Sequence, residues 1–138
     1  MSTRSKARKA ALDLLYEADI KGANPLDLLH VRIQSDDVLI REYTTELVEG
    51  VQTHRRKIDE LIILYAQGWD MDRMPAVDRN IVRIALYELL WRSEIPEKVA
   101  IDQALELAQT LSTDDSVSYI NGVLGAILNN RGDISLDA

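Results

Sequence analysis

The segment from Pro75 to Arg92 carries apolar side chains on almost every side of a helix. One stripe at helical spacing consists of Val82, Ala85, Leu86 and Leu89, and Ile81, Ile84 and Leu90 lie outside that stripe. A helix that is apolar nearly all round has to be covered by other elements. The segment therefore predicts the central helix of a bundle, and the rest of the chain is expected to surround it.

Apolar residues at helical spacing predict further helices on both sides of this segment. All three prolines, Pro25, Pro75 and Pro96, stand where helices are expected to begin, a position at which proline costs little. The other expected helices span about residues 4–21, 25–33, 40–65 with a bend near Thr53 and His54, 97–111 and 115–128. Gly22 and Gly68 are expected to end two of them, and Asp115 or Ser116 to cap the last. Without an alternating strand or a hairpin turn, the fold class is all-α, a compact bundle of about seven helices.

Length and composition favour one domain over residues 1–138. A chain of 138 residues buries roughly 68–70% of its unfolded surface and needs neither disulfides nor a bound metal to fold. It contains no cysteine, which excludes a thiol nucleophile and a disulfide framework and fits the reducing cytoplasm. No segment is a continuous apolar span of membrane length, so neither a membrane nor a signal peptide is expected.

The net charge of −7 hides an uneven distribution. The first nine residues contain Arg4, Lys6, Arg8 and Lys9 and no acid, whereas the remaining residues carry 12 basic against 23 acidic side chains. An acidic body repels nucleic acid at long range, so an RNA contact is expected only at this basic tip and with modest affinity. A solvated N-terminal tail is the alternative interpretation. Cations in a first helical turn oppose the helix dipole, which an anionic partner would compensate.

Candidate catalytic and metal-ligating residues are few. His30 and His54 have no acidic or histidine neighbour at metal-ligand spacing and are expected on helix surfaces. The adjacent Asp114 and Asp115 are more typical of a helix start than of general acid–base chemistry. Gly122 and Gly125 lie in an apolar helix with no strand before it, so close helix packing is predicted for them rather than a phosphate-binding loop. Neither an enzyme nor a cofactor or metal site is expected.

Three stretches in the second half, VDRNIVRIALYEL, IPEKVAIDQALELA and DDSVSYINGVL, occur in an order and spacing that resembles the NusB family of transcription antitermination factors. A shorter match lies at Ala7, Arg8, Ala11, Leu15 and Tyr16, at the spacing of the family's arginine-rich helix. The resemblance implies a factor that binds boxA leader RNA together with the ribosomal protein NusE. Such a factor promotes read-through by RNA polymerase in ribosomal RNA operons.

The resemblance also implies the residues of the RNA surface, which joins the first helix to the start of the last. They are Arg4, Lys6, Arg8, Lys9 and Tyr16 with Asp115, Ser118, Tyr119 and Asn121. The tyrosines are expected to stack on or hydrogen-bond unpaired bases, although packing at a helix surface explains them as well. Lysine lacks the planar bidentate contacts of arginine, which favours Arg8 over Lys6 and Lys9 as a specific contact.

The start of the central helix is the expected NusE surface. By resemblance Asp72, Asp78, Arg79 and Arg83 lie there, and an acidic helix suits a basic ribosomal protein. An ordinary solvated face, with intrahelical pairs such as Glu88 with Arg92, is the competing interpretation. Trp69 and Trp91 are expected in the core or at an interface.

Two other functions stay open. One is a helical interaction module, such as a homodimer, that binds no RNA. The other is a detached NusB-like domain of an RNA cytosine methyltransferase, which the absence of a cysteine nucleophile and of a cofactor-binding βαβ pattern argues against.

Overall fold

The computed structural model describes residues 2–35, 39–66, 68 and 70–136. In these residues it contains seven α-helices and no strand, so the predicted all-α bundle is confirmed. The helices are α1 Thr3–Lys21, α2 Pro25–Gln34, α3 Glu42–Thr53, α4 Arg55–Tyr65, α5 Ala76–Trp91, α6 Glu97–Leu111 and α7 Asp114–Asn129. A short 3-10 helix, η1 Arg131–Asp133, follows. None of the described helices has both the length and the apolar character that crossing a membrane requires.

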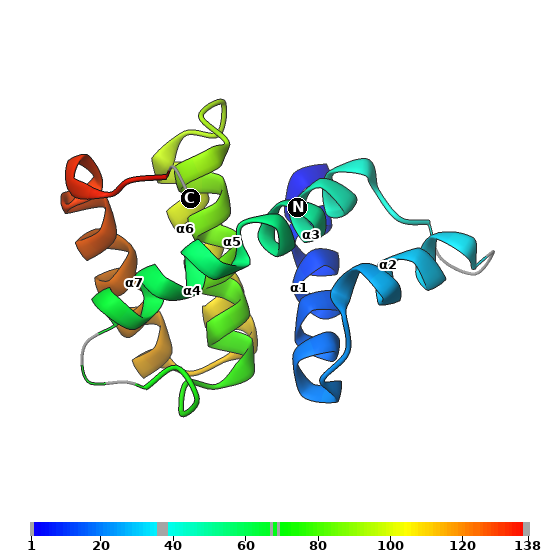
Figure 1. Cartoon of the computed structure of the whole chain (residues 1–138), viewed down its shortest axis with the longest axis horizontal. Helices are drawn as coiled ribbons and strands as arrows, with labels where there is room; N and C mark the ends of the chain where they lie inside the picture. Colours follow the sequence, from blue (N-terminus) through cyan, green and yellow to red (C-terminus); the bar gives the residue numbers. More distant parts are fainter. Residues whose placement is uncertain (1, 36–38, 67, 69, 137–138) are drawn as a thin grey trace.

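Helix α5 is the centre of the bundle, as its sequence predicts. It packs against α1, α3, α4, α6 and α7, and every residue from Asn80 to Leu90 is buried. In Figure 1, α1, α2 and α3 lie on one side of α5, and α4 and α7 lie on the other. Each of the helices that contact α5 thereby buries its apolar face against this one central helix.

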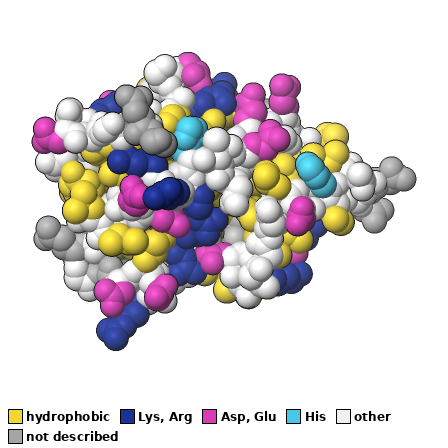
Figure 2. All heavy atoms as spheres, in the orientation of Figure 1, with side chains coloured by type: hydrophobic (Ala, Val, Ile, Leu, Met, Phe, Trp, Pro, Cys, Tyr) yellow, Lys and Arg dark blue, Asp and Glu magenta, His cyan; other side chains and the backbone are white. Residues whose placement is uncertain are grey.

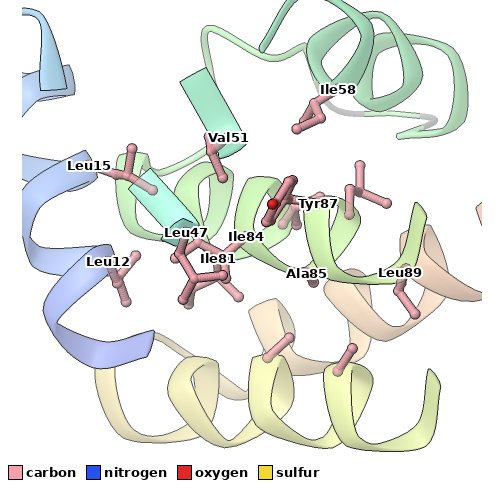
Figure 3. Packing of buried hydrophobic residues seen from close by; sticks show 14 of the residues in the cluster. Leu12, Leu15, Leu47, Val51, Ile58, Ile81, Ile84, Ala85, Tyr87 and Leu89 are labelled. Carbon is pink, nitrogen blue, oxygen red and sulfur yellow. The ribbon is translucent and has the colours of Figure 1, made fainter. Parts of the chain in front are cut away.

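The buried apolar residues form one cluster around α5. Figure 3 shows Leu12 of α1, Leu47 of α3 and Ile81 of α5 pointing toward one another. On another side of α5, Tyr87 points toward the region where α3 meets α4 (Figure 3). A continuous core of this kind holds the N-terminal and C-terminal ends of α5 at fixed places relative to α1 and α7.

Several helix ends differ from the expectation in detail. The expected bend near Thr53 is a complete break, because His54 separates α3 from α4. Helix α4 ends at Tyr65, before the predicted stop at Gly68. Helix α7 is capped by Thr113, whose hydroxyl accepts a hydrogen bond from the Ser116 N–H at 3.1 Å, and not by Asp115 or Ser116. Gly22 ends α1 in the left-handed region at φ 64°, as predicted.

The prediction of close packing at Gly122 and Gly125 is wrong. A Cβ atom at either position would meet nothing within 4 Å. Gly50 of α3 is the glycine that close packing requires, because a Cβ there would overlap the ring of Tyr87. The apolar context of α7 pointed to the wrong glycines, since helix periodicity does not reveal which neighbour faces a given residue.

Candidate nucleic-acid interface

The basic tip is the first two turns of α1. Ser2 caps the helix by accepting a hydrogen bond from the Ser5 N–H at 3.1 Å. Arg4 and Lys6 are exposed, and the Arg4 guanidinium lies 4.8 Å from the centre of the Tyr43 ring. The helix therefore begins early enough to hold both cations in an ordered first turn, where a phosphate backbone can approach them.

The other two cations of the tip are already paired. Lys9 forms a salt bridge with Asp13 at 2.7 Å on the same helix. Arg8 is buried, with 3% of its side chain exposed, and its Nη2 lies 2.9 Å from the Glu88 carboxylate of α5. The expected cluster of Arg4 and Arg8 on one surface is therefore not formed, and a contact between Arg8 and RNA stays a prediction that requires its ion pair to open.

Glu88 is a residue whose role the sequence did not reveal. Its carboxylate accepts hydrogen bonds from Arg8 and from the Tyr43 hydroxyl, and it is almost fully buried. Its expected pairing with Arg92 is wrong, because Arg92 pairs with Glu46 and Glu94. Burial and the nearby Glu88 carboxylate raise the pKa of Tyr43, so its hydroxyl stays protonated and donates. No sequence signal links residues that are 45 and 80 positions apart.

The residues expected at the start of α7 are accessible. Asp115, Ser118 and Asn121 are exposed, and Tyr119 is half-buried. Tyr119, Ser118 and Tyr65 line a surface hollow between α4 and α7. Burial raises the pKa of the Tyr119 hydroxyl. Tyr16 of α1 is 39% exposed.

The two halves of the expected RNA surface lie at different ends of the bundle. In Figure 1, α1 begins at the top of the view, whereas α7 begins near the bottom on the opposite side of α5 and α6. A hollow lies between α1 and α6 beside the basic tip. It is lined from α1 by Ser5 and Lys9, and from α6 by Gln103, Glu106 and Thr110. Leu111, the last residue of α6, also lines this hollow, and α7 begins at Asp114, so the hollow ends near the start of α7 in the sequence.

The expected partner surface at the start of α5 is mostly built from internal ion pairs. Asp72 is exposed, but Asp78 is fully buried and accepts hydrogen bonds from the hydroxyls of Ser112 and Ser116, both at 2.6 Å. The Asp78 carboxylate thus anchors the α6–α7 connection onto α5. A direct contact from Asp78 to a partner stays a prediction.

Arg79 and Arg83 share one acceptor. Both bond to the Asp19 carboxylate of α1, at 2.9 and 3.1 Å, and Arg83 also pairs with Asp59 of α4 at 2.9 Å. Arg83 is 4% exposed and Arg79 is half-buried. These arginines hold α1, α4 and α5 together, and of the two, Arg79 is the more open to a partner.

We expect Asp19→Asn to change how stability depends on pH. Burial alone would raise the pKa of Asp19, but hydrogen bonds from Asn80 and Arg79 outweigh it, and the pKa is lowered from its ordinary 3.8. A lowered folded-state pKa stabilises the fold above the ordinary value, and this stabilisation disappears as the pH falls through the folded-state pKa. Thermal melting followed by circular dichroism should show the wild type losing its advantage over Asp19→Asn below about pH 4. A difference that stays constant at acid pH would contradict this, and Asp13→Asn, on an exposed part of α1, is the matched control.

The described residues form no metal site, and the face drawn in Figure 2 has no broad basic area. No group of three His, Asp or Glu side chains among the described residues could hold a metal ion. Figure 2 shows Lys and Arg side chains in small groups with Asp and Glu between them. His30 is exposed, and His54 stacks on Trp91 with ring centres 4.2 Å apart. Trp91 packs against the core, as expected, and Trp69 lies outside the described residues.

Comparisons with known proteins agree with the resemblance. The model of the NusB family matches residues 5–129. A transcription antitermination protein NusB from Saccharopolyspora erythraea is 55% identical over 129 residues, which cover 92% of this chain and 87% of that protein. Nearly the whole length of both proteins is therefore shared.

Solved structures show the same fold. A structure of T. maritima NusB matches with a TM-score of 0.80 and 29% identity, over 93% of this chain and 92% of that chain. A structure of the antitermination factors NusB and NusE in complex with dsRNA matches with a TM-score of 0.79 and 26% identity. That match covers 91% of this chain and 96% of the other.

Proposed function

Because this chain belongs to the NusB family, we propose that it is a transcription antitermination factor that binds boxA leader RNA together with NusE. In this role residues 1–138 act as one domain in the cytoplasm, as a non-enzymatic adaptor that helps RNA polymerase read through terminators in ribosomal RNA operons. The observation that carries the proposal is the 55% identity to an antitermination protein over nearly the full length of both chains.

The exposed cations of the tip account for the first contact with RNA. Arg4 and Lys6 bind phosphates, and the α1–α6 hollow guides the strand past Lys9 toward α7. At the start of α7, Asp115, Ser118 and Asn121 accept or donate hydrogen bonds at base edges, and Tyr119 packs beside them. A strand that follows this path has to expose its bases, which favours single-stranded RNA over the deep major groove of a duplex.

NusE binds at the start of α5 in this proposal. Asp72 offers an exposed carboxylate, and Arg79, whose guanidinium bonds to Asp19 and to the Met71 and Met74 carbonyls, contributes the 16% of its side chain that is exposed. Asp78 and Arg83 support the surface from within, since both are buried and bonded to neighbouring helices. The solved complex of NusB and NusE with dsRNA contains a chain similar to this one and supports the pairing with NusE.

Fluorescence anisotropy with labelled boxA RNA tests the proposal. The wild type should bind boxA more tightly than a scrambled RNA, and more tightly still when NusE is present. Arg4→Ala with Lys6→Ala should weaken binding and lower the slope of log affinity against log salt by about 0.7 for each phosphate that no longer has a cation beside it. Lys21→Ala, at the far end of α1, should leave both the affinity and the slope unchanged.

Two results would count against the proposal. Absence of boxA binding with active NusE would leave a helical interaction module without RNA binding. Equal binding of boxA and scrambled RNA would show that the chain holds RNA only by charge.

A further inference from the structure

A cavity separate from the α1–α6 hollow has no role in the proposed function. It holds about 410 Å³ and lies where the α3–α4 junction meets the end of α5. Its walls are Thr53, His54, Arg56, Lys57, Glu60 and Trp91, with Leu136 from the C-terminal segment. A volume of this size is within the range of small-ligand sites.

The cavity combines aromatic and cationic side chains. The His54 and Trp91 rings are stacked 15° from parallel, and Trp91 is half-buried, so part of its ring faces the cavity. Burial lowers the pKa of His54, which keeps its ring neutral at neutral pH. Arg56 is 95% exposed and lies 3.6 Å from Glu60, so its guanidinium can turn toward a ligand anion. An aromatic platform beside long cationic side chains suits a nucleobase and its phosphate.

One ring, that of Tyr43, contacts both the basic tip and the residue that follows Trp91. The guanidiniums of Arg4 and Arg92 lie 4.8 and 5.5 Å from the centre of the same Tyr43 ring. Arg92 directly follows Trp91 in the chain. The first turn of α1 and the end of α5 therefore meet at Tyr43, and Trp91 of the cavity belongs to this end of α5, not to its start, where NusE is proposed to bind.

We propose that this cavity binds a nucleotide of the RNA that flanks the boxA core, with the base stacked on Trp91 and its phosphate at Arg56 and Lys57. The inference rests on the proposed function, because the tip has to hold the core for the flanking RNA to reach the cavity. The flank then adds affinity with little dependence on its sequence, since stacking on a ring tolerates every base.

The test uses the full chain with saturating NusE and two kinds of labelled RNA, the boxA core alone and the core extended by single-stranded uridines at either end. The wild type should bind one of the extended RNAs at least about five-fold more tightly than the core, the gain expected from stacking one base. Trp91→Ala should remove that gain and leave core binding unchanged, whereas Trp91→Phe should keep part of it.

Charge variants show whether a loss of the gain in Trp91→Ala comes from the missing ring or from a folding defect. Arg56→Glu changes an exposed side chain and should also remove most of the gain, whereas Lys21→Glu should not. Core binding with no gain from either extension, or a gain that survives both Trp91→Ala and Arg56→Glu, overturns the cavity site and leaves the proposed function intact. Failure to bind the core overturns the proposed function, and the cavity inference with it.

Discussion

Glu88→Ala should lower the free energy of unfolding by about 3–5 kcal/mol, the usual cost of removing one partner from a buried ion pair. The substitution leaves the Arg8 guanidinium, 3% exposed, without its carboxylate at 2.9 Å. It also leaves the Tyr43 hydroxyl without its acceptor. Arg8 keeps a 3.3 Å hydrogen bond to Gln103 and a contact with the Tyr43 ring, and neither supplies a compensating charge.

Urea denaturation followed by circular dichroism measures this destabilisation. Asp102→Ala is the matched control, because it breaks an exposed pair with Lys98 and should cost at most about 0.5 kcal/mol. The double variant Arg8→Met with Glu88→Leu should recover much of the stability, since apolar residues of similar volume replace both charges. A decrease from Glu88→Ala no larger than that of the control would show that the pair contributes nothing to the fold.

This prediction changes how an RNA-binding experiment on Arg8 has to be interpreted. If Arg8→Ala weakens RNA binding, there are two explanations. Either a phosphate contact is missing, or the unpaired Glu88 carboxylate has displaced α1. Arg4 and Lys6 are exposed, so replacing them removes a phosphate contact without leaving a buried charge unpaired. A comparison of the wild type with the double variant Arg8→Met and Glu88→Leu, which leaves no unpaired charge, then shows whether the guanidinium itself contacts RNA.

The elements of the fold were predictable because they depend on local spacing. Periodic apolar residues located the helices, the three prolines marked beginnings, and the all-round apolar character of α5 placed it at the centre. The break at His54 was seen only as a bend, since the apolar pattern continues through it. Thr113 caps α7 because its backbone is extended there. The sequence does not single it out, since the neighbouring Asp and Ser residues are equally good caps.

The sequence predicted which residue types form the candidate site, but not which of their side chains are exposed. The sequence marks Arg4, Lys6, Asp115 and Ser118 as polar, and the structure leaves them accessible. It marks Arg8 and Asp78 in the same way, yet both are buried by partners that lie far away along the chain. A charged residue on a helix is expected at the surface unless a distant partner is known, and one sequence carries no signal for such a partner.

Gly50→Ala should destabilise the protein, although alanine is the better helix former. A Cβ atom on Gly50 would overlap the Tyr87 ring, which is 8% exposed and packed in the core. Overpacking of this kind costs about 1–3 kcal/mol, and the gain in helix propensity offsets about 0.5–1 kcal/mol of it. We expect the free energy of unfolding to fall by about 1–2 kcal/mol in urea denaturation.

The same substitution elsewhere should have the opposite sign. Gly122 lies inside α7, and a Cβ there would meet nothing within 4 Å, so Gly122→Ala should stabilise the protein by about 0.5–1 kcal/mol. Replacing Tyr87 with leucine removes the ring atoms that the new methyl group would meet. Gly50→Ala should therefore become neutral or stabilising in a Tyr87→Leu background, measured against Tyr87→Leu alone. If Gly50→Ala destabilises equally in both backgrounds, the cost comes from the α3 backbone and not from contact with the ring.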